Sequence, residues 1–160
     1  MYHEMVILSI VAKKRILGID YGRRRIGLAL SSPCRTIVSP SGYIVNKGPK
    51  KNVVPFAEFI KKYDVGFVVL GLPLYADGNE SEMSREVREF GTWITDNFGL
   101  EVIYHDERLT SREAEDILRN EMHIKDPKKI AEMVDSMAAN MVLNSWLQKS
   151  KEEKKNDIYY

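Results

Sequence analysis

The order of apolar and polar residues in the first third of the chain predicts strands. Residues 15–20, RILGID, are apolar up to a final aspartate, which is typical of a buried strand. Gly22 offers a turn, and apolar patterns return at residues 25–32 and 36–45. Pro40 limits the last of these to a sheet edge or a bulge, because proline cannot donate a hydrogen bond to a neighbouring strand. Three strands with short connections predict an antiparallel meander.

The apolar period changes to that of a helix after the turn-rich stretch NKGPKK. Apolar residues recur at helical spacing between residues 53 and 63, and the continuous apolar run at 65–73 is typical of a central parallel strand. Helical spacing returns between residues 87 and 94, where Asn79 with Glu82 is the expected capping pair. Strand and helix therefore alternate in this part of the chain.

The last third of the chain predicts one more strand and two helices. Residues 100–109 form the strand, and Thr110 with Glu113 is a capping-box pattern for a helix that runs to about residue 120. Pro127 begins the last helix, whose apolar face holds Ile130, Val134, Met137, Ala138, Met141 and Val142. A meander followed by strand–helix alternation predicts an α/β domain, a mixed five-stranded sheet flanked by helices, with its ligand site at the strand ends.

Length and composition predict a single domain. Residues 15–148 of the 160 are expected to form it, while residues 1–14 are an N-terminal extension or an extra strand. The apolar run in that extension is far shorter than the ~20 residues of a membrane span, so no membrane partner is expected. Residues 149–160 are rich in charged side chains, and this composition predicts a disordered tail. The lone Cys34 excludes an internal disulfide and favours a reducing, cytoplasmic location.

The net charge of +1 means that any site for a polyanion must be a local patch. Arginine clusters offer two such patches. Arg23, Arg24 and Arg25 follow the aspartate that ends the first strand, and Arg108 and Arg112 follow Glu107 at the end of the fifth strand. Arginines in these places can hold phosphates with two parallel hydrogen bonds. The alternative is that each arginine pairs with a neighbouring acid.

Three acidic residues lie in apolar surroundings that make a charge costly without a partner. Asp20 ends the first strand, Glu107 lies at the end of the fifth strand, and Asp135 lies on the last helix. Carboxylates that converge suit Mg²⁺ or Mn²⁺, and two such ions ~4 Å apart can drive phosphodiester hydrolysis. The alternatives are a turn residue at Asp20, a surface ion pair at Glu107, and a solvated helix position at Asp135. Spacing alone does not decide whether the three meet.

Four segments resemble the YqgF/RuvX family of RNase H-like bacterial proteins. They are GIDYGRRRIGLAL, VVLGLPLYADGNESEM, YHDERLTSREAEDIL and VDSMAANMVLNSWL, in that order along the chain. The resemblance implies an RNase H-like fold and places the family's acidic, metal-binding and catalytic positions at Asp20, Glu107 and Asp135. It also implies a nuclease with a two-ion Mg²⁺ or Mn²⁺ site.

The family resemblance implies an endonuclease that acts on structured RNA, in maturation of the 5′ end of pre-16S ribosomal RNA. Two other functions remain open. A resolvase of Holliday-junction DNA would need a homodimer, because it must cut two strands symmetrically. A non-catalytic module that binds nucleic acid or the ribosome is the third, and the near-neutral net charge favours it.

Overall fold

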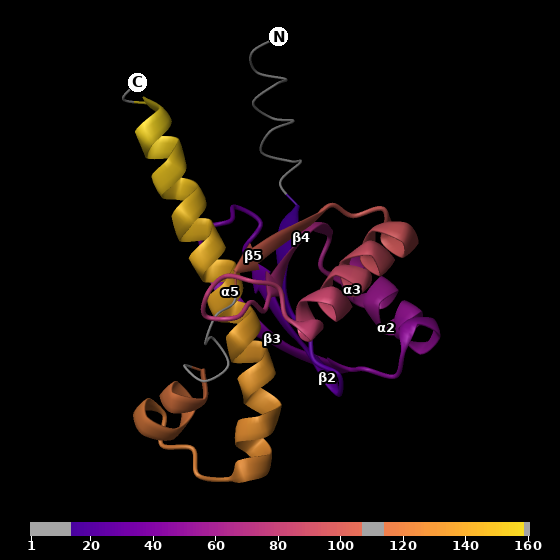
Figure 1. Ribbon diagram of the computed structural model, residues 1–160, viewed down its shortest axis with the longest axis vertical. Coiled ribbons are helices and arrows are strands. Elements are labelled where there is room, and N and C mark those ends of the chain that lie inside the picture. Colours follow the sequence, from indigo (N-terminus) through magenta and orange to yellow (C-terminus); the bar gives the residue numbers. More distant parts are fainter. Residues whose placement is uncertain (1–13, 107–113, 159–160) are drawn as a thin grey trace.

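The structure is a computed structural model that describes residues 14–106 and 114–158. Its centre is a five-stranded sheet of order β3-β2-β1-β4-β5 (Figure 1). The strands are β1 Arg15–Asp20, β2 Arg25–Ser31, β3 Val38–Val45, β4 Val65–Leu72 and β5 Val102–Asp106. β1, β2 and β3 form the predicted antiparallel meander, while β4 is parallel to β1 and β5 to β4. The mixed sheet is confirmed, and Pro40 lies on β3, an edge strand.

Helices cover both faces of the sheet. α2 Pro49–Lys62 and α3 Glu82–Phe98 lie on one face, and the long α5 Pro127–Ile158 crosses the other (Figure 1). Two apolar clusters follow from this layering. One joins the sheet to α2 and α3 and is centred on Phe56, Leu17, Ile19, Leu70 and Ile94. The other joins it to α5 and contains Ile16, Ala29, Val69, Ala139, Val142 and Leu143. The central strands are apolar without interruption because both of their faces are buried.

Two glycines allow α5 to lie directly against β1 and β2. A Cβ atom at Gly18 would collide with the Leu143 side chain, and one at Gly27 would overlap the backbone of Asp135. Ser136, the next residue on α5, donates a 3.3 Å hydrogen bond to the Leu28 carbonyl and accepts one of 3.2 Å from the Gly42 amide. This part of α5 is therefore held at a fixed height above the sheet.

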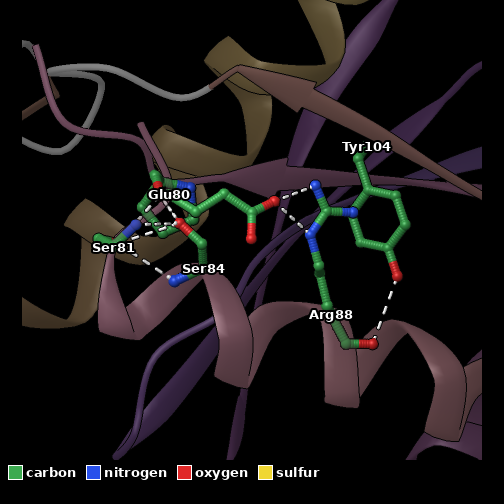
Figure 2. Close-up of polar contacts among 6 residues, drawn as sticks. Glu80, Ser81, Ser84, Arg88 and Tyr104 are labelled. Atoms are coloured by element: carbon green, nitrogen blue, oxygen red, sulfur yellow. Dashed lines mark hydrogen bonds and ion pairs between the residues drawn. The ribbon is translucent and has the colours of Figure 1, made fainter. Parts of the chain in front are cut away.

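The N-terminus of α3 differs from the prediction of an Asn79–Glu82 cap. Ser81 is the N-cap and forms a reciprocal capping box with Ser84, through hydrogen bonds of 3.1 and 2.9 Å (Figure 2). Asn79 is instead held in the preceding turn, where its backbone and side-chain nitrogens both donate to Asp77. A local side-chain bond thus removed Asn79 from the helix end.

Arg88 ties α3 to the neighbouring strand and loop. Its Nε donates a 2.6 Å hydrogen bond to Glu80, and its guanidinium carbon lies 5.1 Å from the centre of the Tyr104 ring on β5 (Figure 2). The Tyr104 hydroxyl donates in turn to the Arg88 carbonyl at 3.4 Å. These contacts fix the orientation of α3 beside the carboxyl ends of the parallel strands.

Residues 149–158, part of the segment for which the sequence predicts a disordered tail, continue α5 to Ile158, with exposed side chains at 151–157. Lysine and glutamate favour helices, so the segment propagates a helix already nucleated by the packed part of α5. The N-terminal extension up to residue 13 and the Thr110–Glu113 cap lie outside the described residues. The structure describes only the C-terminal part of the helix predicted after the fifth strand, and that part ends in the short π-helix η1 Ile117–Glu121. None of the helices in the described ranges combines the length and apolar character of a membrane-spanning segment.

Candidate functional site

Asp20 lies at the carboxyl end of the central strand and is 8% exposed. Its strand β1 pairs in parallel with β4, which pairs in parallel with β5, so all three end at one edge of the sheet. Ile16 packs against α5, and Gly18 lies beneath Leu143 of α5. Because side chains of a strand alternate between faces, the Asp20 side chain also lies on the α5 face.

The register between β1 and β2 brings Asp135 to the same place. Asp20 is paired directly with Gly27, and directly opposed residues of an antiparallel pair lie on the same face. Gly27 is also the residue that the backbone of Asp135 covers. Two of the three acids singled out in the sequence therefore lie close together, between the end of β1 and α5. The third, Glu107, lies outside the described residues.

The neighbouring Asp106 occupies a different position from these acids. His105 lies on the α5 side, because its Nε2 atom is 3.0 Å from the Ser145 hydroxyl of α5. Asp106 follows it and so lies on the opposite face of the sheet. His105 was not among the residues that the sequence singled out. It lies two positions after Ile103 on β5, and because Ile103 packs on the α5 side, this spacing places His105 on the same face. Burial is the main cause of the lowered pKa of His105.

Arg25 forms an ion pair with Asp135, with 2.8 Å between Nε and Oδ2. The two side chains are 33% and 20% exposed. The guanidinium carbon also lies 5.7 Å from the centre of the Tyr43 ring. The sequence left open whether this arginine holds phosphate or pairs with an acid. In the structure it pairs with an acid, Asp135. Arg25 therefore places a cation directly beside Asp135, one of the two carboxylates.

Arg23 is also paired with an acid. Its Nε and terminal nitrogen hold both carboxylate oxygens of Glu86 on α3, at 2.6 to 3.1 Å. This hydrogen bonding raises the pKa of Arg23 and lowers that of Glu86. Arg24 is exposed at the same turn. The other two predicted phosphate ligands, Arg108 and Arg112, lie outside the described residues.

The described residues alone do not complete a metal centre. Among residues 14–106 and 114–158, no group of three histidine, cysteine, aspartate or glutamate side chains is close enough to hold an ion. Asp20 and Asp135 provide two hard oxygen donors from distant parts of the chain, which is the donor chemistry that Mg²⁺ and Mn²⁺ prefer. The residues present are therefore compatible with such an ion if one further acid joins them.

Comparison with known proteins identifies the family. Residues 14–149 match the family model of RuvX, described as a Holliday junction resolvase. A relative from Endomicrobium trichonymphae, which bears the name "Putative pre-16S rRNA nuclease", is 38% identical over 139 residues, covering 87% of this chain and 99% of that protein.

Solved structures share the fold of this chain. A complex of the fowlpox virus resolvase with Holliday junction DNA has a TM-score of 0.54 at 13% identity, covering 84% of this chain and 97% of that chain. A complex of Thermus thermophilus RuvC with a Holliday junction substrate has a TM-score of 0.50 at 13% identity, covering 86% and 96%. This likeness confirms the RNase H-like fold. With the match over most of its length, the chain belongs to the RuvX family.

Proposed function

We propose that this protein is a metal-dependent endonuclease that hydrolyses phosphodiester bonds of structured RNA, in 5′-end maturation of pre-16S ribosomal RNA. The observation that supports a nuclease best is the pair Asp20 and Asp135, which share one face at the end of the central strand. The names of the relatives support RNA as the substrate.

Asp20, Asp135 and Glu107 are the residues that would hold the divalent ions, either Mg²⁺ or Mn²⁺. When bound, a pair of such ions activates water and stabilises the leaving oxygen of a phosphodiester. The alternation of β5 supports Glu107 as the third ligand in preference to Asp106, because Ile103 and His105 both lie on the α5 side. A strand that continued in this way would bring residue 107 to the face that Asp20 occupies.

The arginines at the turn after β1 would bind and orient the substrate. Arg25 pairs with Asp135, and because its side chain is 33% exposed, part of it is accessible to a substrate. Were Asp135 to hold a divalent ion, the Arg25 guanidinium would be free to donate two parallel hydrogen bonds to a phosphate of the substrate. Arg24 is already exposed, and we assign Arg108 and Arg112 the same role of binding phosphate.

The second candidate function is resolution of four-way DNA junctions. The description of the matching family model favours it. It would require a homodimer that presents two sites to two strands. The third candidate, a binding module without catalysis, would keep nucleic-acid affinity but would not depend on the acids for its function.

A cleavage assay tests these functions together. Wild-type protein is incubated with a pre-16S 5′ leader or a four-way DNA junction, with Mn²⁺, Mg²⁺ or EDTA. Asp20→Asn is compared with Asp96→Asn, a control on the exposed side of α3. We expect metal-dependent cutting of the RNA that only Asp20→Asn abolishes. Equal cutting by Asp20→Asn refutes the proposed site, and cutting of the junction alone selects the resolvase. Binding without any cutting selects the module.

A further inference from the structure

A cavity opens at the same edge of the sheet as Asp20, but on the opposite face. It has a volume of about 320 Å³ and lies between the turn after β1, the start of α2 and the middle of α3. Tyr21, Phe90 and Trp93 form its aromatic wall, Asn52 lies at its base, and Glu86 and Glu89 lie at its rim. Because Tyr21 directly follows Asp20, the cavity and the proposed cleavage site are separated only by the end of β1.

The rings of the aromatic wall pack against one another and are therefore fixed in place. The Phe90 and Trp93 rings are stacked, with centres 5.4 Å apart and an interplanar angle of 21°, and the Tyr21 ring centre lies 4.9 Å from that of Phe90. Edge contacts with Phe56 and Phe98 hold Trp93 from behind. Rigid aromatic rings that line a cavity favour a flat, conjugated ligand, and nucleobases of single-stranded nucleic acids stack on such rings.

The base of the cavity is held by two asparagines. The Asn52 side chain, 3% exposed, accepts a 3.0 Å hydrogen bond from the Lys47 amide and donates one of 2.9 Å to Asn46. Asn46 donates in turn to the Gly22 carbonyl at 3.0 Å, at the turn beside Asp20. These amides fix the connection between β3 and α2, so the cavity is preformed rather than dependent on a mobile loop.

The rim supplies hydrogen-bond acceptors. Glu86 is already neutralised by Arg23. Glu89, one helical turn further along α3, is exposed and has no ion pair or hydrogen bond with any described side chain. A carboxylate only accepts hydrogen bonds at neutral pH, so it selects a ligand with N–H donors. In nucleic acids, glutamate accepts from the exocyclic amino group of cytosine.

We propose that this cavity, lined by Tyr21, Phe90, Trp93 and Glu89, binds one unpaired nucleobase with an exocyclic amino group, in the strand that the enzyme cuts. This rests on the proposed function, because it takes a nucleic-acid strand as the substrate. A base that leaves the strand near the cut can pass over the end of β1 and stack on the aromatic wall. Arg23, which pairs with Glu86 of the cavity lining and is itself exposed, would meet the adjacent phosphate. Uracil fits the same space but can offer Glu89 only its ring N–H, so without the exocyclic amino group it binds more weakly.

Short RNA strands test the preference for an amino group. Labelled hexamers of cytidylate and uridylate are titrated in EDTA, which prevents cleavage, and binding is followed by fluorescence anisotropy. Wild type should bind the cytidylate strand at least about fivefold more tightly, the lower range for one well-placed base contact. Glu89→Gln should lose this ratio, while Glu58→Gln, a control at an exposed position of α2, should keep it. Equal binding of both strands by wild type, or an unchanged ratio in Glu89→Gln, would overturn the proposal.

A second measurement locates the bound base. Trp146→Phe leaves Trp93 as the only tryptophan of the chain's two. Stacking of cytidylate on the cavity wall should then quench the remaining tryptophan fluorescence, and an unquenched signal at saturation would overturn the proposal. The cleavage assay separates the two ideas. Metal-dependent cutting without the base preference would refute only the proposal that the cavity binds a base. A base preference without any cutting would refute only the proposed nuclease function.

Discussion

Replacement of Gly27 by alanine tests whether the close approach of α5 to the sheet positions the proposed site. The added methyl group would overlap the backbone carbonyl of Asp135, and backbone atoms cannot rotate out of the way as a side chain can. To restore ordinary van der Waals separation, α5 must move away from β2 by about 1 Å or more. That movement takes Asp135 away from Asp20, which is paired with Gly27.

The size of both effects follows from this geometry. Overpacking a tight interior typically costs about 1–3 kcal/mol, and we expect the upper part of that range, about 2–3 kcal/mol, because the clash is with backbone. A displacement of ~1 Å at a catalytic constellation can lower the rate about 100-fold. The free energy of unfolding is measured by urea denaturation, and the rate by metal-dependent cleavage of the RNA leader.

The control is Gly99→Ala, at the C-terminal cap of α3. Gly99 has a φ of 65° and no neighbouring atom within 4 Å of a new Cβ, so the substitution strains the backbone without moving a helix. We expect it to cost about 1 kcal/mol and to leave the cleavage rate of the folded protein unchanged. Wild-type stability and rate in Gly27→Ala would refute the reasoning. Equal rate losses in the two variants would show that stability alone controls activity.

Three further predictions concern other parts of the molecule. Arg25→Gln removes the cation that pairs with Asp135, so the affinity for Mn²⁺, measured by calorimetry, should rise several-fold; no change would show that the pair does not compete with an ion. Ser81→Ala should lower the free energy of unfolding by about 1 kcal/mol through loss of the capping box, whereas Asn79→Ala should lower it by less. A larger loss for Asn79→Ala in urea titrations would show that Asn79, and not Ser81, caps the helix. Hydrogen bonds from Ser32 and Thr36 lower the pKa of the exposed Cys34 to about 7, so the rate of alkylation by iodoacetamide should rise through pH 7, where the thiolate forms, and Ser32→Ala should move that rise to higher pH; a rise centred above pH 8 in the wild type would contradict it.

The sequence by itself determined the elements and their order. Continuous apolar runs at 15–20 and 65–73 marked the strands buried on both faces, and Pro40 marked the edge strand. These signals are local, because a strand buried on both faces is continuously apolar, whereas a strand buried on one face alternates apolar and polar residues. The same local reasoning singled out Asp20 and Asp135 as acids in apolar company. Their role as ligands stays a prediction.

Local pattern was insufficient where a competing partner decided the outcome. The cap moved from Asn79 to Ser81 because Asp77 holds Asn79, and the charged end of α5 is helical because a packed helix precedes it. Arg23 and Arg25 face Glu86 and Asp135, which are distant in the sequence. No spacing rule relates such pairs, since each depends on how two elements dock.

Only the tertiary structure decided that Asp20 and Asp135 lie together. Their proximity depends on the β1–β2 register, which pairs Asp20 with Gly27. It also depends on the lack of a side chain at Gly27, which allows the α5 backbone to approach at that point. The tertiary structure also decided that Tyr21, Asn52 and Glu89 line one cavity, although they come from a turn and from two different helices. A sequence records which face of each element is buried, but register and helix height above a sheet arise from packing between segments. These features exist only once the chain has folded.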